Sequence, residues 1–155
     1  MEHRNQIQVN TPRVMFAAMR SGSGKTTITC GVLAALKKEN IRMQAYKCGP
    51  DYIDPMFHRT VLGIDTGKRE TFFAGADAIG RILARDTKDA ELIVMEGVMG
   101  YYDGVGGTTT MASSYELSKV TKTPVVLIVD AKGASVTLAA TIRGIMEYKK
   151  DSRIA

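Results

Sequence analysis

Glycine, hydroxyl and lysine side chains are concentrated in one short segment, where the sequence reads Arg-Ser-Gly-Ser-Gly-Lys-Thr-Thr. An apolar run over 14–19 precedes it and an apolar-periodic segment follows, so the pattern predicts a buried strand, a glycine turn and a helix. Gly22 and Gly24 allow the backbone to approach an anion closely. The helix dipole favours negative charge at that point. The residues expected to contact a nucleotide are Ser21, Gly22, Ser23, Gly24, Lys25, Thr26 and Thr27.

Two side chains in this segment have the chemistry that ATP requires. Lys25 is expected to place its ammonium between the β- and γ-phosphates, and the Thr26 hydroxyl is expected to bind Mg²⁺. The full pattern G-x-x-x-x-G-K-[ST] has a glycine where this chain has Met19, so only its second half matches. A glycine turn that merely joins strand to helix is the alternative, but the surrounding strand and helix favour nucleotide binding.

Acidic residues follow two other predicted strands and are candidate magnesium ligands with Thr26. Asp51 comes three residues after a strand predicted over 41–48, and Glu96 directly follows a strand predicted over 91–95. Carboxylate oxygens suit Mg²⁺, and parallel strands end at the same edge of a sheet. The alternative for Glu96 is a carboxylate bonded to the glycine amides that follow it. A turn explains Asp54, which precedes a proline, equally well.

Strands and helices alternate along the whole chain. This order predicts a three-layer α/β/α fold with a mainly parallel sheet and ligands at the carboxyl ends of the strands. Four strands are few for this architecture, and the sequence stops after a helix, so a truncated domain is expected. The predicted strands cover 14–19, 41–48, 91–95 and 125–129, and the predicted helices cover 25–39, 76–85, 111–120 and 134–148. In the last helix, the residues predicted to face inward are Leu138, Ile142, Ile145 and Met146.

Composition narrows the class of protein. The 155 residues, 45% hydrophobic and 24% charged, predict one globular domain over 13–155 after a flexible start over 1–12. Cys30 and Cys48 are too few for a disulfide framework or a zinc site and are expected to be buried thiols in a reducing compartment. No apolar run approaches the ~20 residues of a membrane span. The net charge of +5, without interleaved aromatic residues, argues against nucleic acid and suits a polyanionic small molecule.

Three segments together resemble the N-terminal, ATP-binding domain of the cobyrinic acid a,c-diamide synthase family. They are SGSGKTT, KCGPDYIDPMFH and EGVMGYYDG. The GPDYIDP-x-x-H segment is the specific part, because the phosphate loop alone fits many families. The family is grouped with dethiobiotin synthetase and the partition ATPases. The resemblance covers nearly the whole chain and implies a dethiobiotin-synthetase-like phosphate-loop fold.

The resemblance implies ATP- and Mg²⁺-dependent amidation of the a and c carboxylates of cobyrinic acid through acyl phosphates, in cytoplasmic cobalamin biosynthesis. Ammonia would come from glutamine through an amidotransferase domain expected to lie outside this chain, so the chain alone is expected to be inactive. The expected partners are a corrinoid polycarboxylate and that domain, with no nucleic acid or membrane. The residues expected to act in catalysis are Lys25, Asp51, Asp54 and Glu96. Those expected to contact the substrate are Lys47, Tyr52, His58 and Asp103.

Departures from the family pattern leave other functions open. Lys68-Arg69-Glu70 stands where the family usually has Asn-Leu-Asp, which leaves the identity of the substrate open. Nickel-sirohydrochlorin a,c-diamide synthase is one alternative. A non-catalytic nucleotide-binding module or a partition-type ATPase is another. In the partition ATPases a lysine at the position of Arg20 reaches across a homodimer. For His58 the alternative is a loop histidine without a substrate contact, and for Asp103-Gly104 the alternative is a turn.

Overall fold

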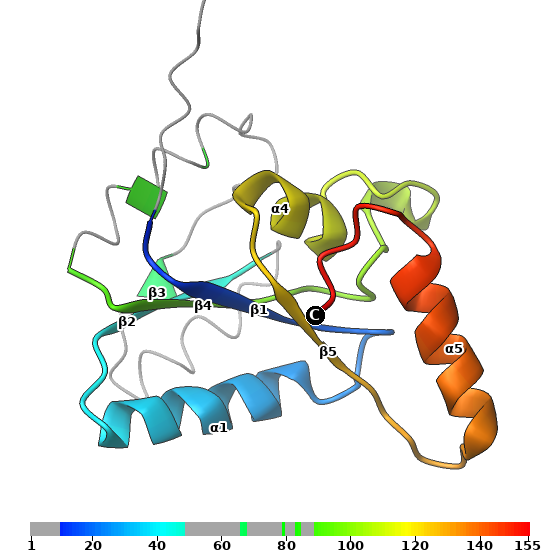
Figure 1. Ribbon diagram of the computed structural model, residues 1–155, viewed down its shortest axis with the longest axis horizontal. Coiled ribbons are helices and arrows are strands. Elements are labelled where there is room, and N and C mark those ends of the chain that lie inside the picture. The colour runs from blue at the N-terminus through cyan, green and yellow to red at the C-terminus, as the bar shows by residue number, and fades with distance from the viewer. Residues whose placement is uncertain (1–9, 49–65, 68–78, 80–82, 85–88) are drawn as a thin grey trace, which may run out of the picture.

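The computed structural model describes residues 10–48, 66–67, 79, 83–84 and 89–155. Within them, a parallel sheet with the strand order β3-β2-β4-β1-β5 lies between helices (Figure 1). The strands are β1 Arg13–Ala18, β2 Met43–Lys47, β3 Thr66–Gly67, β4 Leu92–Glu96 and β5 Val125–Ile128. The helices are α1 Lys25–Lys38, α4 Ser114–Thr121 and α5 Val136–Glu147, with a short 3-10 turn, η2, at Val105–Gly107. The predicted α/β/α class with a parallel sheet is confirmed.

The two central strands, β4 and β1, are apolar almost throughout because both of their faces are covered. Met15 of β1 pairs with Met95 on one side and with Val125 on the other. Successive side chains alternate between faces, so Met15 packs in the core on the α4 side while Phe16 packs in the core on the α1 side. This register brings the carboxyl ends of β1, β2 and β4 to one edge of the sheet.

The helices on the two faces match the predicted segments with shifted boundaries. α1 covers one face through Leu33, which is fully buried beside Phe16 and Val94 (Figure 1). α4 was predicted from residue 111 but begins at Ser114, because Ser113 caps it by accepting the Glu116 amide. Of the helix predicted over 76–85, the described residues 79, 83 and 84 are helical. The strand β3 was not predicted, because two residues are too few to show the alternation of apolar and polar side chains that marks a strand.

The prediction that four residues of the last helix face inward is only partly correct. Leu138, Ile142 and Ile145 are half-buried, whereas Met146 is 44% exposed and no residue of α5 is buried. The reason is position, since α5 lies beside the outer strand β5 and does not cross a face of the sheet (Figure 1). Only a narrow side of the helix therefore reaches the core, where Ile145 packs on the α4 side.

A tyrosine cluster joins the segment after β4 to α4 and α5. The ring centroids of Tyr101 and Tyr102 are 4.6 Å apart, and the Tyr102 ring lies 5.1 Å from Tyr115 and 5.0 Å from Tyr148. The Tyr102 hydroxyl donates to the Ile145 carbonyl at 2.8 Å. These contacts fix α5 to the rest of the fold in place of a buried apolar face.

The residues after α5 return to the outer side of β5. The Val125 amide donates to the Arg153 carbonyl at 2.9 Å, and the Ala155 amide donates to the Val125 carbonyl at 3.0 Å. Asp151 anchors this segment to α4, because it accepts the Tyr115 hydroxyl at 2.6 Å and lies 2.6 Å from the Lys119 ammonium. In the part of the chain that the structure describes, no helix is both long and apolar enough to cross a membrane.

The Asp151 anchor is expected to make stability depend on acid pH. Hydrogen bonds from Lys119 and Tyr115 lower the pKa of Asp151 from 3.8 to about 2. A lowered folded-state pKa stabilises the fold above the unfolded pKa, and this stabilisation is lost as pH falls from about 4 to about 2. Asp151→Asn should flatten the dependence of the melting temperature on pH in that window. An unchanged acid slope in the variant would show that Asp151 does not contribute.

Candidate functional site

The loop between β1 and α1 has the shape of an anion cradle. Gly22 and Gly24 have φ values of +77° and +87°, a conformation that glycine adopts at no steric cost. The Ser23 hydroxyl donates to the Arg20 carbonyl at 3.0 Å and closes the turn. No side chain caps the first turn of α1, so its amides are presented at the edge where the strands end.

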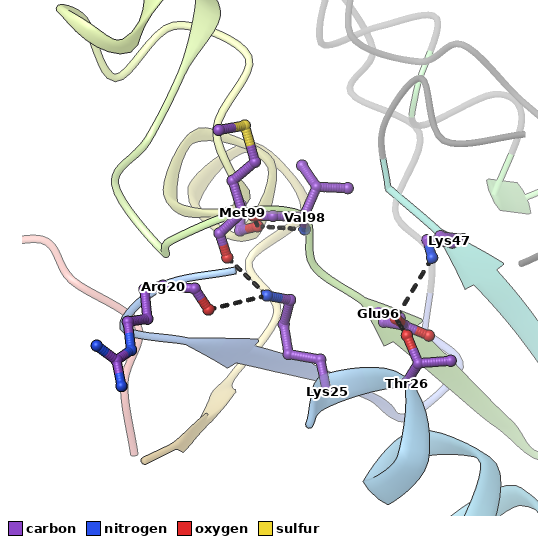
Figure 2. A network of polar contacts seen from close by, with 8 residues as sticks. Arg20, Lys25, Thr26, Lys47, Glu96, Val98 and Met99 are labelled. Atoms are coloured by element: carbon purple, nitrogen blue, oxygen red, sulfur yellow. Dashed lines mark hydrogen bonds and ion pairs between the residues drawn. The ribbon is translucent and has the colours of Figure 1, made fainter. Parts of the chain in front are cut away.

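Lys25 points across this edge toward the segment that follows β4. Its ammonium donates to the Met99 carbonyl at 2.7 Å and to the Arg20 carbonyl at 3.4 Å (Figure 2). Only 8% of the residue is exposed. Burial lowers the pKa of Lys25 below its ordinary value, and the nearby charges of Glu96 and Asp103 oppose this shift. The ammonium is thus desolvated, and this strengthens its electrostatic interaction with an anion.

Glu96, Thr26 and Lys47 meet beside Lys25. The Thr26 hydroxyl donates to Glu96 Oε1 at 2.5 Å, and the Lys47 ammonium lies 3.6 Å from the same oxygen (Figure 2). The sheet register explains the ion pair, because Lys47 and Glu96 are paired at the ends of the neighbouring strands β2 and β4. Their side chains are only 7% and 2% exposed. The alternative role for Glu96 was a carboxylate bonded to the amides of the glycines that follow it. This role fails at Gly97, because the Gly97 amide donates to the Phe16 carbonyl.

The oxygen atoms of the Thr26 hydroxyl and the Glu96 carboxylate are suitable ligands for a magnesium ion. Mg²⁺ in phosphate-transfer proteins binds one or two protein oxygens and completes its shell with phosphate oxygens and water. Thr26 and Glu96 supply one hydroxyl and one carboxylate in contact with each other, beside the loop that would hold the phosphates. Among the described residues there is no cluster of three histidine, cysteine or acidic side chains, which a transition metal would favour.

The segment 97–104 has one contact that the sequence did not predict and one turn that it had offered as an alternative. Ser114 Oγ accepts the Val98 amide at 3.0 Å and donates to the Val98 carbonyl at 3.2 Å. Asp103, predicted to contact substrate, accepts the Gly100 amide at 2.9 Å and so holds a turn. A Cβ on Gly100 would overlap the Asp103 carboxylate, which explains the glycine there. No residue-type signal marks Ser114, because serine is common at the first turn of a helix whether or not it binds a neighbouring segment.

Several predicted site residues lie outside the described part of the chain. They are Asp51, Tyr52, Asp54 and His58, together with Lys68-Arg69-Glu70. Lys25 and Glu96, by contrast, come together at one edge of the sheet, as predicted from the strand ends, and Lys47 lies beside Glu96. The catalytic, metal-binding and substrate-binding roles of both groups of residues stay predictions.

Arg20 forms a contact that is expected to matter little. Its guanidinium lies 3.3 Å from Asp130 at the end of β5, and the two side chains are 72% and 36% exposed. Water and salt screen exposed ion pairs of this kind, so they contribute little. Arg20→Ala should therefore change ATP affinity by less than about threefold, measured by calorimetry at two protein concentrations. A large loss that depends on protein concentration would instead indicate a residue acting across a dimer.

Comparison with known proteins identifies the family. Residues 14–148 match the model of the CobQ/CobB/MinD/ParA nucleotide binding domain. The chain belongs to this family. It is 39% identical over 140 residues to cobyrinate a,c-diamide synthase of Thermoplasma acidophilum, covering 90% of this chain and 31% of the relative. It is 37% identical over 143 residues to hydrogenobyrinate a,c-diamide synthase of Streptomyces coelicolor, covering 92% of this chain and 29% of the relative.

The chain thus spans about a third of the length of these curated relatives. Solved structures support the fold of the nucleotide binding domain. The chloroplast FtsY of Physcomitrella patens matches with a TM-score of 0.60 and 14% identity, covering 92% of this chain and 48% of that one. FtsY from Elizabethkingia anophelis matches with a TM-score of 0.61 and 13% identity, covering 99% of this chain and 51% of that one. At this identity the likeness concerns the fold alone.

Proposed function

We propose that this chain is the ATP- and Mg²⁺-binding part of a ligase that amidates the a and c carboxylates of cobyrinic acid. The observation that supports this most is the convergence of Lys25, Thr26 and Glu96 at the carboxyl edge of the sheet. The proposal also relies on relatives that are 37–39% identical and are named for this reaction. Because the chain matches about a third of their length, the activity is proposed for the longer protein.

The reaction explains why a phosphate-binding site is needed. A carboxylate is a poor acyl electrophile, so its oxygen attacks the γ-phosphorus of ATP and ADP leaves, giving an acyl phosphate. Ammonia then attacks the acyl carbon, phosphate leaves, and an amide forms. The protein's task is positioning and charge neutralisation. Lys25 and the amides of residues 21–27 would hold the phosphates. Bound Mg²⁺ would neutralise the charge that builds on them.

Thr26 and Glu96 are proposed to hold the magnesium ion, with Asp51 as a third ligand. Lys47 would hold the Glu96 carboxylate in place beside Thr26, since its ammonium lies 3.6 Å from Glu96 Oε1. Asp54, Tyr52 and His58 are proposed to position the corrinoid carboxylates together with Lys47 and Asp103. The formal charge of +5 suits a polyanionic substrate.

The ammonia is proposed to come from glutamine through an amidotransferase domain. Such a domain needs a cysteine nucleophile activated by a histidine. Burial raises the pKa of the Cys48 thiol to about 12, which makes it a poor nucleophile. Cys30 is half-buried, and its thiol pKa is also raised. These free thiols fit a reducing cytoplasm, where we place the protein.

Calorimetric titration of Mg-ATP into the chain tests the nucleotide part of this proposal. Saturable binding that chelation of Mg²⁺ weakens is expected. Titration of cobyrinic acid into the ATP-saturated chain then tests the substrate part, with hydrogenobyrinic acid as the comparison because one relative is named for it. Binding of ATP without binding of either corrinoid would favour a partition-type ATPase module, which the family description also covers. Failure to bind ATP would reject both functions.

A further inference from the structure

The segment that follows β4 exposes three large apolar side chains beside the phosphate loop. Met99 is 53% exposed, Val105 is 52% exposed and Met111 is 59% exposed. The Met99 carbonyl accepts a hydrogen bond from the Lys25 ammonium at 2.7 Å, whereas the Met99 side chain points away from Lys25 (Figure 2). Single apolar side chains are ordinary on a protein surface, but several in one segment next to a ligand site indicate a binding surface.

Backbone hydrogen bonds fold these three residues into one loop. The Val105 amide donates to the Met111 carbonyl at 2.9 Å, which brings these two residues together. A turn in which the Asp103 amide donates to the Gly100 carbonyl at 3.0 Å leads from Met99 to Val105. Because these bonds hold the loop in shape, its exposed apolar side chains form a fixed surface next to Lys25. We call Met99, Val105 and Met111 the apolar patch.

Charge is distributed unevenly between the apolar patch and the rest of the candidate site. Residues 97–112 carry a single charged side chain, Asp103, which accepts the Gly100 amide at 2.9 Å within the loop. The charged side chains Lys25, Lys47 and Glu96 of the candidate site belong instead to α1, β2 and β4. Ligand sites typically combine apolar surface with a few polar groups that fix orientation. A ligand with an apolar body and anionic groups at its rim would fit both parts.

We propose that the apolar patch binds the face of the tetrapyrrole ring while a carboxylate at the rim of the ring reaches the phosphate site. The inference rests on the proposed function and extends it, because it assigns the surface that holds the body of the substrate. A tetrapyrrole is a broad, flat macrocycle with apolar faces, and covering one face removes apolar area from water. Two of the three patch residues are methionines, whose flexible and polarisable side chains adapt to such a surface.

Substitutions at Val105 and Met111 test the patch, and Met99 is left unchanged because its carbonyl contacts Lys25. Val105→Ser and Met111→Ser should each weaken the binding of cobyrinic acid to the ATP-saturated chain about fivefold, and the double variant about 20-fold, because apolar contact area is lost. Mg-ATP affinity should stay within about twofold in all three variants. Val136→Ser and Met146→Ser, which alter exposed side chains of the same types on α5, are the matched controls.

Two further probes separate recognition of the ring from recognition of its carboxylates. A corrinoid whose side chains are all amides keeps the apolar faces, so the double variant should lose affinity for it by the same factor as for cobyrinic acid. Succinate has carboxylates without a ring and should not distinguish the double variant from the wild type. The heat-capacity change on binding cobyrinic acid should be negative in the wild type and smaller in magnitude in the double variant, because less apolar surface is buried.

Equal affinity of the wild type and the double variant for both corrinoids would overturn the patch and leave the proposed function intact. Self-association of the wild-type chain that the double variant abolishes, with unchanged corrinoid affinity, would also overturn it and assign the surface to a second copy of the chain. Binding of Mg-ATP without binding of either corrinoid would reject the patch together with the substrate part of the proposed function. Failure to bind Mg-ATP would reject the proposed function and the inference that rests on it.

Discussion

Lys25→Ala is expected to weaken Mg-ATP binding by about 100-fold or more. The ammonium is desolvated, and charge-assisted hydrogen bonds to phosphate are roughly twice as strong as neutral ones. Two such bonds, to the β- and γ-phosphates, would be lost together. Isothermal calorimetry measures the affinity directly, and the expected result is no detectable heat at nucleotide concentrations that saturate the wild type.

Two further variants separate loss of binding from loss of folding. Lys25→Met keeps most of the buried stem and should lose binding to the same degree with less effect on the melting temperature. Lys38→Ala removes an exposed lysine from the last turn of α1 and should leave affinity within about twofold. If Lys25→Met bound Mg-ATP like the wild type, the phosphate-binding role of Lys25 would be wrong.

Glu96→Gln is expected to remove the magnesium dependence of nucleotide binding and to destabilise the fold. Wild-type affinity should fall when Mg²⁺ is chelated, whereas the variant should bind equally weakly with and without the ion, because an amide oxygen is a poorer ligand than a carboxylate. Glu96 and Lys47 form a buried ion pair, and removing one charge of such a pair costs about 3 kcal/mol. Urea unfolding measures this loss.

A double variant and a surface control separate the two effects of Glu96→Gln. Lys47→Met combined with Glu96→Gln removes both buried charges and should recover most of the stability but none of the magnesium dependence. Glu91→Gln removes an exposed carboxylate that lies 3.2 Å from Arg42, and it should leave the urea midpoint of unfolding nearly unchanged, because water and salt screen exposed ion pairs. Full magnesium dependence in Glu96→Gln would contradict the proposed ligand.

The strand, loop and helix around Lys25 could be predicted because each part has its own signal in residue type. An apolar run predicts β1, glycines predict the turn, and an apolar stripe with Leu33 at its centre predicts α1. The convergence of Lys25 and Glu96 followed from the parallel topology alone. The Lys47–Glu96 pair depends on the register of β2 against β4, which residue types do not specify.

Contacts that involve backbone atoms could not be predicted in the same way. The Met99 carbonyl and the two bonds from Ser114 to Val98 depend on where the backbone runs, and any residue offers the same carbonyl and amide. The exposure of Met146 was missed for a related reason. An apolar stripe indicates which side of a helix faces inward, but the place of α5 beside the sheet decides how much of that side is covered.

The tyrosine cluster gives this protein its own optical reporter. The chain has no tryptophan, and four of its six tyrosines lie in the cluster, so tyrosine emission and near-ultraviolet circular dichroism come largely from one place. Tyr101 and Tyr102 follow Met99 within three residues, whereas Tyr148 follows α5. Both spectra of the unlabelled protein therefore record how the segment after β4 packs against α5, without a dye or an introduced fluorophore.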